Sequence, residues 1–284
     1  MPAPDRLLTL IQQATTLTRA TPGRVGHILN LDANDCTELL VVGDLHGRVA
    51  HVQVILKAAD LPNNPTRHIV FQELIHGKFR YPKGGDKSHQ VVDLFAALKC
   101  QFPKQVHYIP GNHELAQWSN RPVLKGNENV NAIFEEGVSE AYGKDWGPKI
   151  YAAYLELFQT LPAIVRAPNR VVVCHTIPSN RLMPTFDPTR LEAETYDPED
   201  FQPGGTLHSL LWGRDTARET VKAFLEKVDG DLLVCGHIAC EKGYATPHDC
   251  QLILDCAENP GGFVLFPTRR RMTLADMMHC IRII

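Results

Sequence analysis

The sequence predicts an α/β domain, because short apolar runs alternate with segments whose apolar side chains recur at helical spacing. The first three runs, residues 39–42, 69–71 and 106–109, are typical of buried strands, and each is followed by a polar loop and a helical segment. Strands in such folds carry functional groups at their carboxyl ends, so we expect a site at one edge of the sheet.

The N-terminal half contains most of the predicted helices. Apolar residues from Leu7 to Leu17 predict a helix at about residues 5–20, which ends before the TPGRVG segment at 21–26. The other helices of this half are expected at residues 49–61, 91–98, 130–142 and 149–161.

The C-terminal half contains four further predicted strands. Residues 171–174 and 232–235 are apolar runs that end at His175 and at Gly236-His237. Between them, a segment rich in Pro, Asp, Glu and Thr predicts a long surface excursion at residues 178–206. The remaining elements are a helix at 216–228 and strands at 252–254 and 263–266.

No repeat or linker divides the chain, so we expect a single domain over residues 1–284. Its expected parts are an N-terminal helix at about 5–20, a core at 38–266 and a C-terminal tail at 267–284.

The composition is that of a globular protein and argues against several functional classes. The chain is 44% hydrophobic with a net charge of -3, which argues against a nucleic-acid partner. It has neither an apolar run long enough to span a membrane nor the pattern of a signal peptide. The eight cysteines form no CxxC pair, which indicates reduced thiols and a cytoplasmic location. The sequence shows no self-complementary patch, so it does not predict an oligomeric state.

The polar groups after the strands are capable of binding metal. A lone histidine after a strand is usually a hydrogen-bonded structural residue, but repetition at the same topological position favours a metal site. Cations such as Mn²⁺, Fe or Zn²⁺ take mixed carboxylate and imidazole ligands, and a carboxylate can bridge two of them. The groups are Asp44 with His46, Glu73 with His76, Asn112 with His113, His175, and His237.

The order of these motifs resembles that of the calcineurin-like metallophosphoesterase superfamily over residues 38–266. The matching motifs are GDLHG at 43–47, GNHE at 111–114, the strand-end His175 and GH at 236–237. Three further segments are similar to the phosphoprotein (Ser/Thr) phosphatase branch: LLWGRD at 210–215, GHIACEKGY at 236–244 and AENPGG at 257–262. The resemblance implies a four-layer sandwich of two mixed β-sheets flanked by helices, and a metal-dependent phosphoric ester hydrolase.

The second motif departs from the family pattern Gly-Asp-x-x-Asp-Arg-Gly, since this chain has FQELIHG at 71–77. Aligned on the end of the strand, Glu73 replaces the bridging Asp and His76 replaces the second acid. Aligned on the final glycine, Gln72 would stand at the bridging position. We favour Glu73, because a neutral amide is a poor bridge between two cations. The family's phosphate-binding Arg is missing in both alignments.

The resemblance implies a role for each site residue. A hydroxide held between two metals would attack phosphorus in line, and His113 would protonate the leaving oxygen, with Glu114 or His76 orienting it. Two divalent ions are implied, with Mn²⁺ favoured and Fe or Zn²⁺ also suited. Asp44 and Glu73 would bridge them. The implied metal ligands are Asp44, His46, Glu73, Asn112, His175 and His237.

Other arginines must then bind the substrate phosphate. Arg214 in LLWGRD is the first choice and Arg48, directly after GDLHG, the second. The basic loop HGKFRYPKGGDKSH that follows the altered motif is either a phosphate-recruiting lip or a solvated charged loop.

The predicted function is a dinuclear metal-dependent phosphatase acting on phosphomonoesters, either small molecules or phosphoserine/phosphothreonine proteins. One alternative is a phosphodiesterase or dinucleoside polyphosphate hydrolase, for which Trp118, Phe186 and Tyr196 are candidate base-stacking residues. The other is a non-catalytic binding protein on the same scaffold, suggested by the altered second motif.

Overall fold

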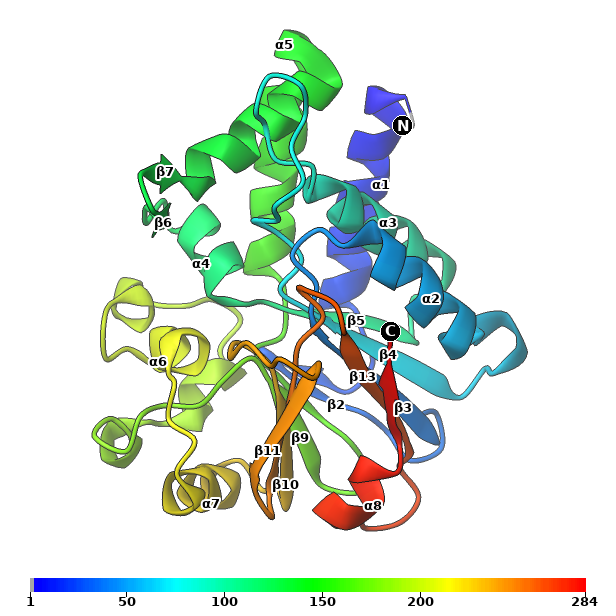
Figure 1. The fold of residues 1–284 in the computed structure, drawn as a ribbon, viewed down its shortest axis with the longest axis vertical. Helices are drawn as coiled ribbons and strands as arrows, with labels where there is room; N and C mark the ends of the chain where they lie inside the picture. Colours follow the sequence, from blue (N-terminus) through cyan, green and yellow to red (C-terminus); the bar gives the residue numbers. More distant parts are fainter. Residues whose placement is uncertain (1–2) are drawn as a thin grey trace.

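Two β-sheets form the centre of the fold in the computed structural model, which describes residues 3–284 (Figure 1). The larger sheet has the spatial order β1 (Arg24–Val25), β2 (Ile28–Asn30), β8 (Ile164–Arg166), β9 (Val171–Cys174), β10 (Leu232–Cys235), β12 (Gln251–Leu254) and β11 (Tyr244–His248). The smaller sheet has the order β14 (Ile281–Ile283), β13 (Gly262–Pro267), β3 (Glu38–Asp44), β4 (Arg67–Gln72) and β5 (Val106–Ile109). A separate hairpin pairs β6 (Leu124–Lys125) with β7 (Glu128–Asn129).

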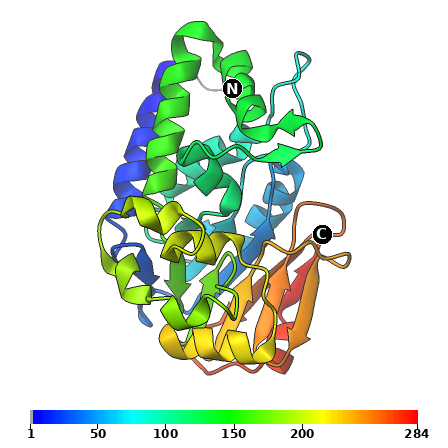
Figure 2. The ribbon, with the colours of Figure 1, turned by 90° about the vertical axis from the view of Figure 1, so that its left-hand side faces the viewer.

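Helices cover the outer faces of the two sheets. Those of the N-terminal half lie in the upper part of Figure 1, and α6 and α7 lie at the lower left. In the turned view of Figure 2, α1 and α5 lie side by side in the upper part, and most of the strands lie in the lower part. The helices are α1 (Pro4–Arg19), α2 (Val49–Ala59), α3 (His89–Gln101), α4 (Asn112–Trp118), α5 (Val130–Gln159), α6 (Thr206–Trp212), α7 (Arg218–Lys227) and α8 (Leu274–Met278).

The apolar strands bury both of their faces, which explains their continuous apolar sequence. On β3, Leu39 and Val41 face the larger sheet, where they pack with Val173 and Val234. Leu40 and Val42 point the other way, into the core under α1, α2, α3 and α5. The larger sheet packs its outer face against α6 and α7. Because β3, β4 and β5 are parallel while β13 is antiparallel to β3, the sheet is mixed, and the predicted four-layer sandwich is confirmed.

The predicted elements are present, with three corrections. The helices expected at 130–142 and 149–161 form one run, α5, interrupted at Gly143, where φ is 75°. The excursion at 178–206 is not only a surface segment, since Phe186 and Leu191 are buried against the α6 and α7 side of the larger sheet. The expected C-terminal tail instead forms α8 and β14, and β14 completes the smaller sheet by pairing with β13.

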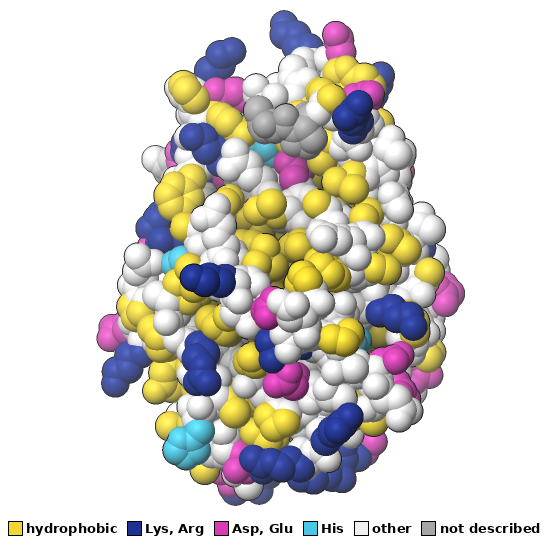
Figure 3. All heavy atoms as spheres, turned by 90° about the vertical axis from the view of Figure 1, so that its right-hand side faces the viewer, with side chains coloured by type: hydrophobic (Ala, Val, Ile, Leu, Met, Phe, Trp, Pro, Cys, Tyr) yellow, Lys and Arg dark blue, Asp and Glu magenta, His cyan; other side chains and the backbone are white. Residues whose placement is uncertain are grey.

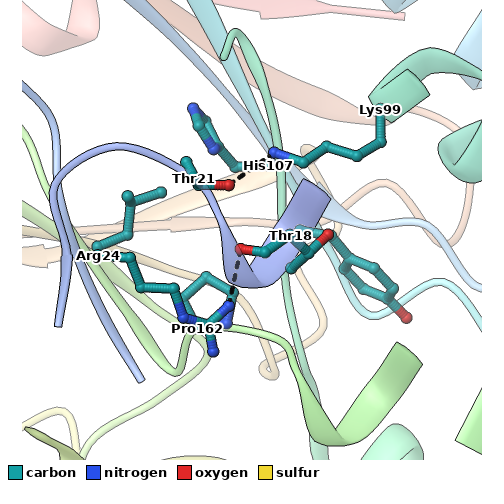
Figure 4. Close-up of a pocket in the computed structure, with 8 residues that line it drawn as sticks. Thr18, Thr21, Arg24, Lys99, His107 and Pro162 are labelled. Atoms are coloured by element: carbon teal, nitrogen blue, oxygen red, sulfur yellow. Dashed lines mark hydrogen bonds between the residues drawn. The ribbon is translucent and has the colours of Figure 1, made fainter. Parts of the chain in front are cut away.

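A buried lysine attaches the end of α1 to the core. Lys99 of α3 is 1% exposed, and its ammonium group donates to Thr21 Oγ1, Pro103 O and Val106 O at 2.7–3.0 Å. Figure 4 shows Lys99 directed at Thr21 beside His107, with Arg24 bonded to the Thr18 backbone. The cavity that these residues line has a volume of about 10 Å³, which is room for a single water molecule. This cluster is therefore a structural connection and not a ligand site.

The surface shows no dominant charge on the face drawn in Figure 3, where basic and acidic side chains are interspersed and apolar side chains occupy the middle. In residues 3–284, no helix combines the length and the apolar character that crossing a membrane requires.

Candidate metal centre

The carboxyl ends of five strands converge on one buried cluster. Asp44 ends β3, Glu73 follows β4, Asn112 follows β5, and His175 and His237 follow β9 and β10. Four residues around this cluster have a left-handed backbone, with φ values of 35–67°: His46, Glu73, His76 and His237. Such φ values are costly for residues other than glycine and concentrate at functional sites, where they aim side chains that regular structure would direct elsewhere.

Glu73 lies at the centre of the cluster. Its Oε2 is 3.3 Å from His46 Nε2, and its Oε1 is 3.6 Å from His175 Nε2. Two groups of ligand-capable atoms share this carboxylate, His46–Glu73–His113 and Glu73–His175–His237. The neighbouring Gln72 donates through its amide nitrogen to Val42 O at 2.8 Å. The structure therefore brings Glu73, and not Gln72, among the histidines.

Asp44 lies against the second group. Its Oδ2 accepts from the backbone N–H of His237 at 2.6 Å, and its Oδ1 is 3.5 Å from His175 Nδ1. Glycine is required where the two carboxylates pass the backbone. A Cβ at Gly236 would lie 2.2 Å from Asp44 Oδ1, and one at Gly111 would lie 2.1 Å from Glu73 Oε1. The glycines of the GH and GNHE motifs thus leave room for these two side chains.

Several of the candidate ligand atoms have no hydrogen-bond partner. Asp44 Oδ1, His175 Nδ1 and His237 Nε2 are buried and unpaired. Asn112 Oδ1 is 3.3 Å from His175 Nε2, which is also 3.0 Å from His237 Nδ1. Buried polar atoms normally have partners, so a group of unpaired oxygen and nitrogen atoms facing one another fits a bound cation. The donor set of carboxylate, imidazole and amide oxygen is one that Mn²⁺, Fe and Zn²⁺ accept.

The charges of the cluster also fit a cation. Burial raises the pKa of Asp44, which the nearby His175 only partly offsets. Burial alone would raise the pKa of Glu73 as well, but His175, His113 and His46 hold it well below its usual value. Burial opposes the charged form of His46, yet Glu73 raises the pKa of His46 to about 9. Without metal, histidine protons balance the buried carboxylates, and a divalent ion can replace those protons.

His113 lies beside the cluster and is held by a chain of two side chains, Gln117 and His76. Gln117 Oε1 is 2.7 Å from His76 Nε2, and His76 Nδ1 is 2.6 Å from His113 Nδ1. The Gln117 amide nitrogen donates to Asn131 O and Tyr151 Oη, so its oxygen must accept from His76 Nε2–H. Burial lowers the pKa of His76 to about 3, so its ring is neutral and its Nδ1 accepts from His113 Nδ1–H. His113 Nε2 remains the atom that can exchange a proton.

Glu114, the other predicted partner of His113, has a different position. Its carboxylate accepts from the backbone N–H groups of Gly111, Leu74 and Ile75 and from the Tyr108 hydroxyl. It therefore joins the start of α4 to the loop after β4, and His76 is the side chain that contacts the His113 ring. Of the two partners predicted for His113, Glu114 and His76, the contacts therefore favour His76.

The two predicted phosphate-binding arginines differ in their surroundings. Arg214 is exposed and donates through Nη1 to the carbonyl of His237 at 3.2 Å, which brings it next to the cluster. Arg48 is held by the loop after β12, where its Nε donates to Ala257 O at 2.7 Å and its Nη2 pairs with Glu258.

Comparison with known proteins agrees with this geometry. The family model for calcineurin-like phosphoesterases matches residues 37–241. The chain belongs to this family. Its members are hydrolases of phosphoric esters, and the family identified from the motifs is confirmed.

Individual relatives of this phosphoesterase are distant. The serine/threonine-protein phosphatases 5 of Homo sapiens and Rattus norvegicus are each 22% identical over 241 residues, which are 79% of this chain and 44% of the relative. The chain thus spans less than half the length of these relatives. A protein serine/threonine phosphatase structure from Saccharomyces cerevisiae, with similarity to human PP5, has a TM-score of 0.69 at 18% identity and covers 93% of this chain and 82% of that one.

A second solved structure, a cold-active protein-tyrosine phosphatase of a psychrophile Shewanella species, has a TM-score of 0.54 at 13% identity. The match covers 84% of this chain and 76% of that one. At these identities the structural matches show the shared fold.

Sequence reasoning about this phosphoesterase missed two residues of the site. Gln117 lies four residues after His113 on α4, and residues four apart lie on the same face of a helix. This spacing is the sequence signal that indicates Gln117 as a neighbour of His113. Asp255 directly follows β12, in the same way that Asp44 ends β3. The backbones of Asp44 and Asp255 pair in parallel at this one position. The Oδ2 of Asp255 accepts from the backbone N–H of Cys240 at 2.9 Å, so it supports the loop after His237.

Of the aromatic candidates for base stacking, Phe186 packs in the core, whereas Trp118 and Tyr196 are half-buried and line a pocket of about 290 Å³. Phe186 is buried against Phe224, with ring centroids 5.7 Å apart. Trp118 and Tyr196 both contact Phe201 edge-on, at 5.0 and 5.7 Å.

Proposed function

We propose that this chain is a dinuclear metal-dependent phosphatase that hydrolyses phosphomonoesters, with phosphoserine or phosphothreonine proteins as candidate substrates. The observation that carries the proposal is the position of Glu73, whose two oxygens face different histidine groups. A shared carboxylate between two ligand groups is the arrangement expected of a two-metal hydrolase.

The proposed ligands divide into two sets around Glu73. Asp44 and His46 would hold the first ion, and Asn112, His175 and His237 the second, with Asp44 and Glu73 shared. His46 Nδ1 faces Ile75 O at 2.8 Å, so its Nε2 is free to act as a ligand. Bound ions would supply Lewis-acid stabilisation of phosphoryl charge and activate water near neutral pH. We favour Mn²⁺ because the set is rich in oxygen donors, and Fe and Zn²⁺ are chemically suited to it.

The proposed proton donor is His113. Gln117 and His76 fix its Nδ1–H, so a protonated His113 carries its transferable proton on Nε2, on the side away from His76. A donor held in this way would protonate the leaving alcohol oxygen of a phosphomonoester.

The phosphate itself would be held by Arg214, which lies next to the metal cluster through its hydrogen bond to the carbonyl of His237. We expect Arg214→Ala to lower kcat/KM by about 10- to 100-fold, the effect of losing hydrogen bonds to a charged group. Bound metal should stay at the wild-type level. Kinetics with para-nitrophenyl phosphate and metal analysis of the same preparation test this, and loss of metal would instead assign Arg214 a structural role.

Two alternatives to a phosphomonoesterase are less well supported. Of the three rings considered for base stacking by a diesterase or dinucleoside polyphosphate hydrolase, Phe186 is buried in the core. Trp118 and Tyr196 line a pocket that contains none of the candidate metal ligands. A non-catalytic binding protein would not need His113 held in a single tautomer, which the contacts of Gln117 and His76 provide.

Removal and return of metal test the proposal. Protein stripped with a chelator should lose hydrolysis of para-nitrophenyl phosphate and regain it with Mn²⁺, with close to two ions bound per chain. Bis(para-nitrophenyl) phosphate should be a much poorer substrate. Equal rates on both esters would favour a diesterase, and absence of turnover despite bound metal would favour a non-catalytic protein.

A further inference from the structure

A pocket of about 330 Å³ lies between the start of α2 and the segment that follows β4. Three cationic side chains line it, those of Arg48, Arg80 and Lys87, together with the ring of Phe79. Phe79 is 44% exposed, which is unusual for a large apolar side chain in this protein. The pocket therefore combines positive charge with one apolar wall.

The pocket is built on the same loops as two residues of the candidate metal centre, His46 and His76. Gly47, at its edge, directly follows His46, and a Cβ at Gly47 would lie 2.7 Å from Ser88 Cβ. Arg80 Nη1 donates to Gly77 O at 2.5 Å, the carbonyl of the residue after His76. The same two loops thus carry His46 and His76 on one side and the cationic pocket on the other.

The cations of the pocket are only partly neutralised. Lys87 Nζ lies 5.1 Å from the Tyr81 ring centroid, and none of the carboxylates in residues 3–284 lies within ion-pair distance of it. Arg80 is 3.5 Å from Asp86 Oδ1, which also accepts from the Ser88 N–H. Arg48 pairs with Glu258 and lies 5.8 Å from the Phe79 ring centroid. Positive charge in a partly enclosed site favours an anionic ligand.

We propose that this pocket binds a second anionic group of the substrate, a carboxylate or a phosphate close to the phosphate that is hydrolysed. The inference rests on the proposed phosphatase function and names the substrates it prefers: phosphorylated peptides with an acidic neighbour. Phe79 packs against the aliphatic part of that neighbour. The basic loop then has two parts. Arg80 and Lys87 line the pocket and fit the interpretation as a phosphate-recruiting lip. Lys83 lies elsewhere, beside Glu136 and Glu140, and fits the interpretation as a solvated charged loop.

Glu258 occupies part of this positive region in the absence of substrate. Its carboxylate is 61% exposed and contacts both Arg48 and Lys78. An anionic group entering the pocket displaces Glu258 from Arg48 and takes its place. The loop at residues 257–259 thereby competes with the substrate for the same cation.

Peptide kinetics test the subsite. A set of phosphoserine peptides carries one glutamate at successive positions around the phosphoserine, and a matched set carries glutamine there. Two further peptides carry a second phosphoserine. We expect kcat/KM to be about tenfold higher for the best glutamate peptide than for its glutamine partner, the effect of one charge-assisted hydrogen bond. The doubly phosphorylated arm shows whether phosphate or carboxylate fits better.

Lys87→Gln should abolish that preference and leave hydrolysis of para-nitrophenyl phosphate unchanged. Lys83→Gln, the same charge change in the same loop, should retain the preference. Thermal unfolding of both variants checks that they fold. A preference that survives Lys87→Gln, or no preference in the wild type, overturns the subsite while turnover of para-nitrophenyl phosphate persists. Loss of all turnover in the wild type would instead contradict the proposed function.

Discussion

Replacing Glu73 with glutamine is expected to reduce bound divalent metal sharply and to lower phosphatase activity by more than about 100-fold. Residues that only orient metal ligands already contribute 10- to 100-fold to affinity or activity, so a shared ligand should contribute more. Glutamine keeps the shape of the side chain but replaces one anionic oxygen by an amide NH₂ group. Metal analysis and para-nitrophenyl phosphate kinetics on the purified variant measure both effects.

The matched control is its neighbour on β4. Gln72 donates to Val42 O and does not contact the histidines, so Gln72→Leu should keep its metal. Some loss of stability is expected from the unpaired Val42 carbonyl, and thermal unfolding separates that loss from loss of metal. Metal loss in the Gln72 variant, with metal retained in Glu73→Gln, would reverse the assignment of the bridging residue.

The strands and the polar residues at their ends could be predicted because a strand buried on both faces needs a nearly continuous apolar sequence. Residues 39–42, 106–109 and 171–174 are mostly apolar and are buried on both faces, and polar residues begin where each strand ends. The polar residues that follow have to lie at the sheet edge, so Asp44, Asn112 and His175 were found without knowledge of the fold. The GNHE and GDLHG motifs supplied the relative order of these strand ends.

The loop after β4 could not be predicted in the same way. Its geometry depends on left-handed backbone at Glu73 and His76, which no propensity indicates for these residue types. Glu114 holds the loop through the N–H groups of Leu74 and Ile75, a contact between segments 40 residues apart. The sequence therefore leaves the partner of His113 open between His76 and Glu114, and the tertiary contacts favour His76.

Replacement of the second acid by His76 changes the environment of His113. A carboxylate beside the ring would stabilise its protonated form, whereas His76 is a neutral acceptor backed by Gln117. Burial, together with His76, holds the pKa of His113 well below its usual value, although Glu73 opposes this. A proton donor with a low pKa is a stronger acid, and it is protonated over a narrower range of pH.

His113→Asn is expected to lower kcat for a phosphoserine peptide by about 10²–10⁴-fold, the usual contribution of a general acid. Metal content should remain near the wild-type level. The loss should be smaller with para-nitrophenyl phosphate, because its leaving group is more acidic and needs less protonation. Equal losses on both substrates, or loss of metal, would indicate that His113 is a ligand of the His46–Glu73–His113 group rather than an acid.

Gln117→Leu tests whether His113 must be oriented by its neighbours in order to donate a proton. It complements His113→Asn, which removes the proton donor itself. Without the Gln117 oxygen, His76 Nε2–H has no acceptor, so His76 can present N–H instead of a lone pair to His113. kcat should fall by about 10- to 100-fold, as for other partners that orient a functional group. The pH at which activity declines should shift, while metal content stays constant. A variant with wild-type kcat and an unchanged pH profile would mean that the Gln117–His76 pair only fills the core, and that Nε2 of His113 is directed by packing alone.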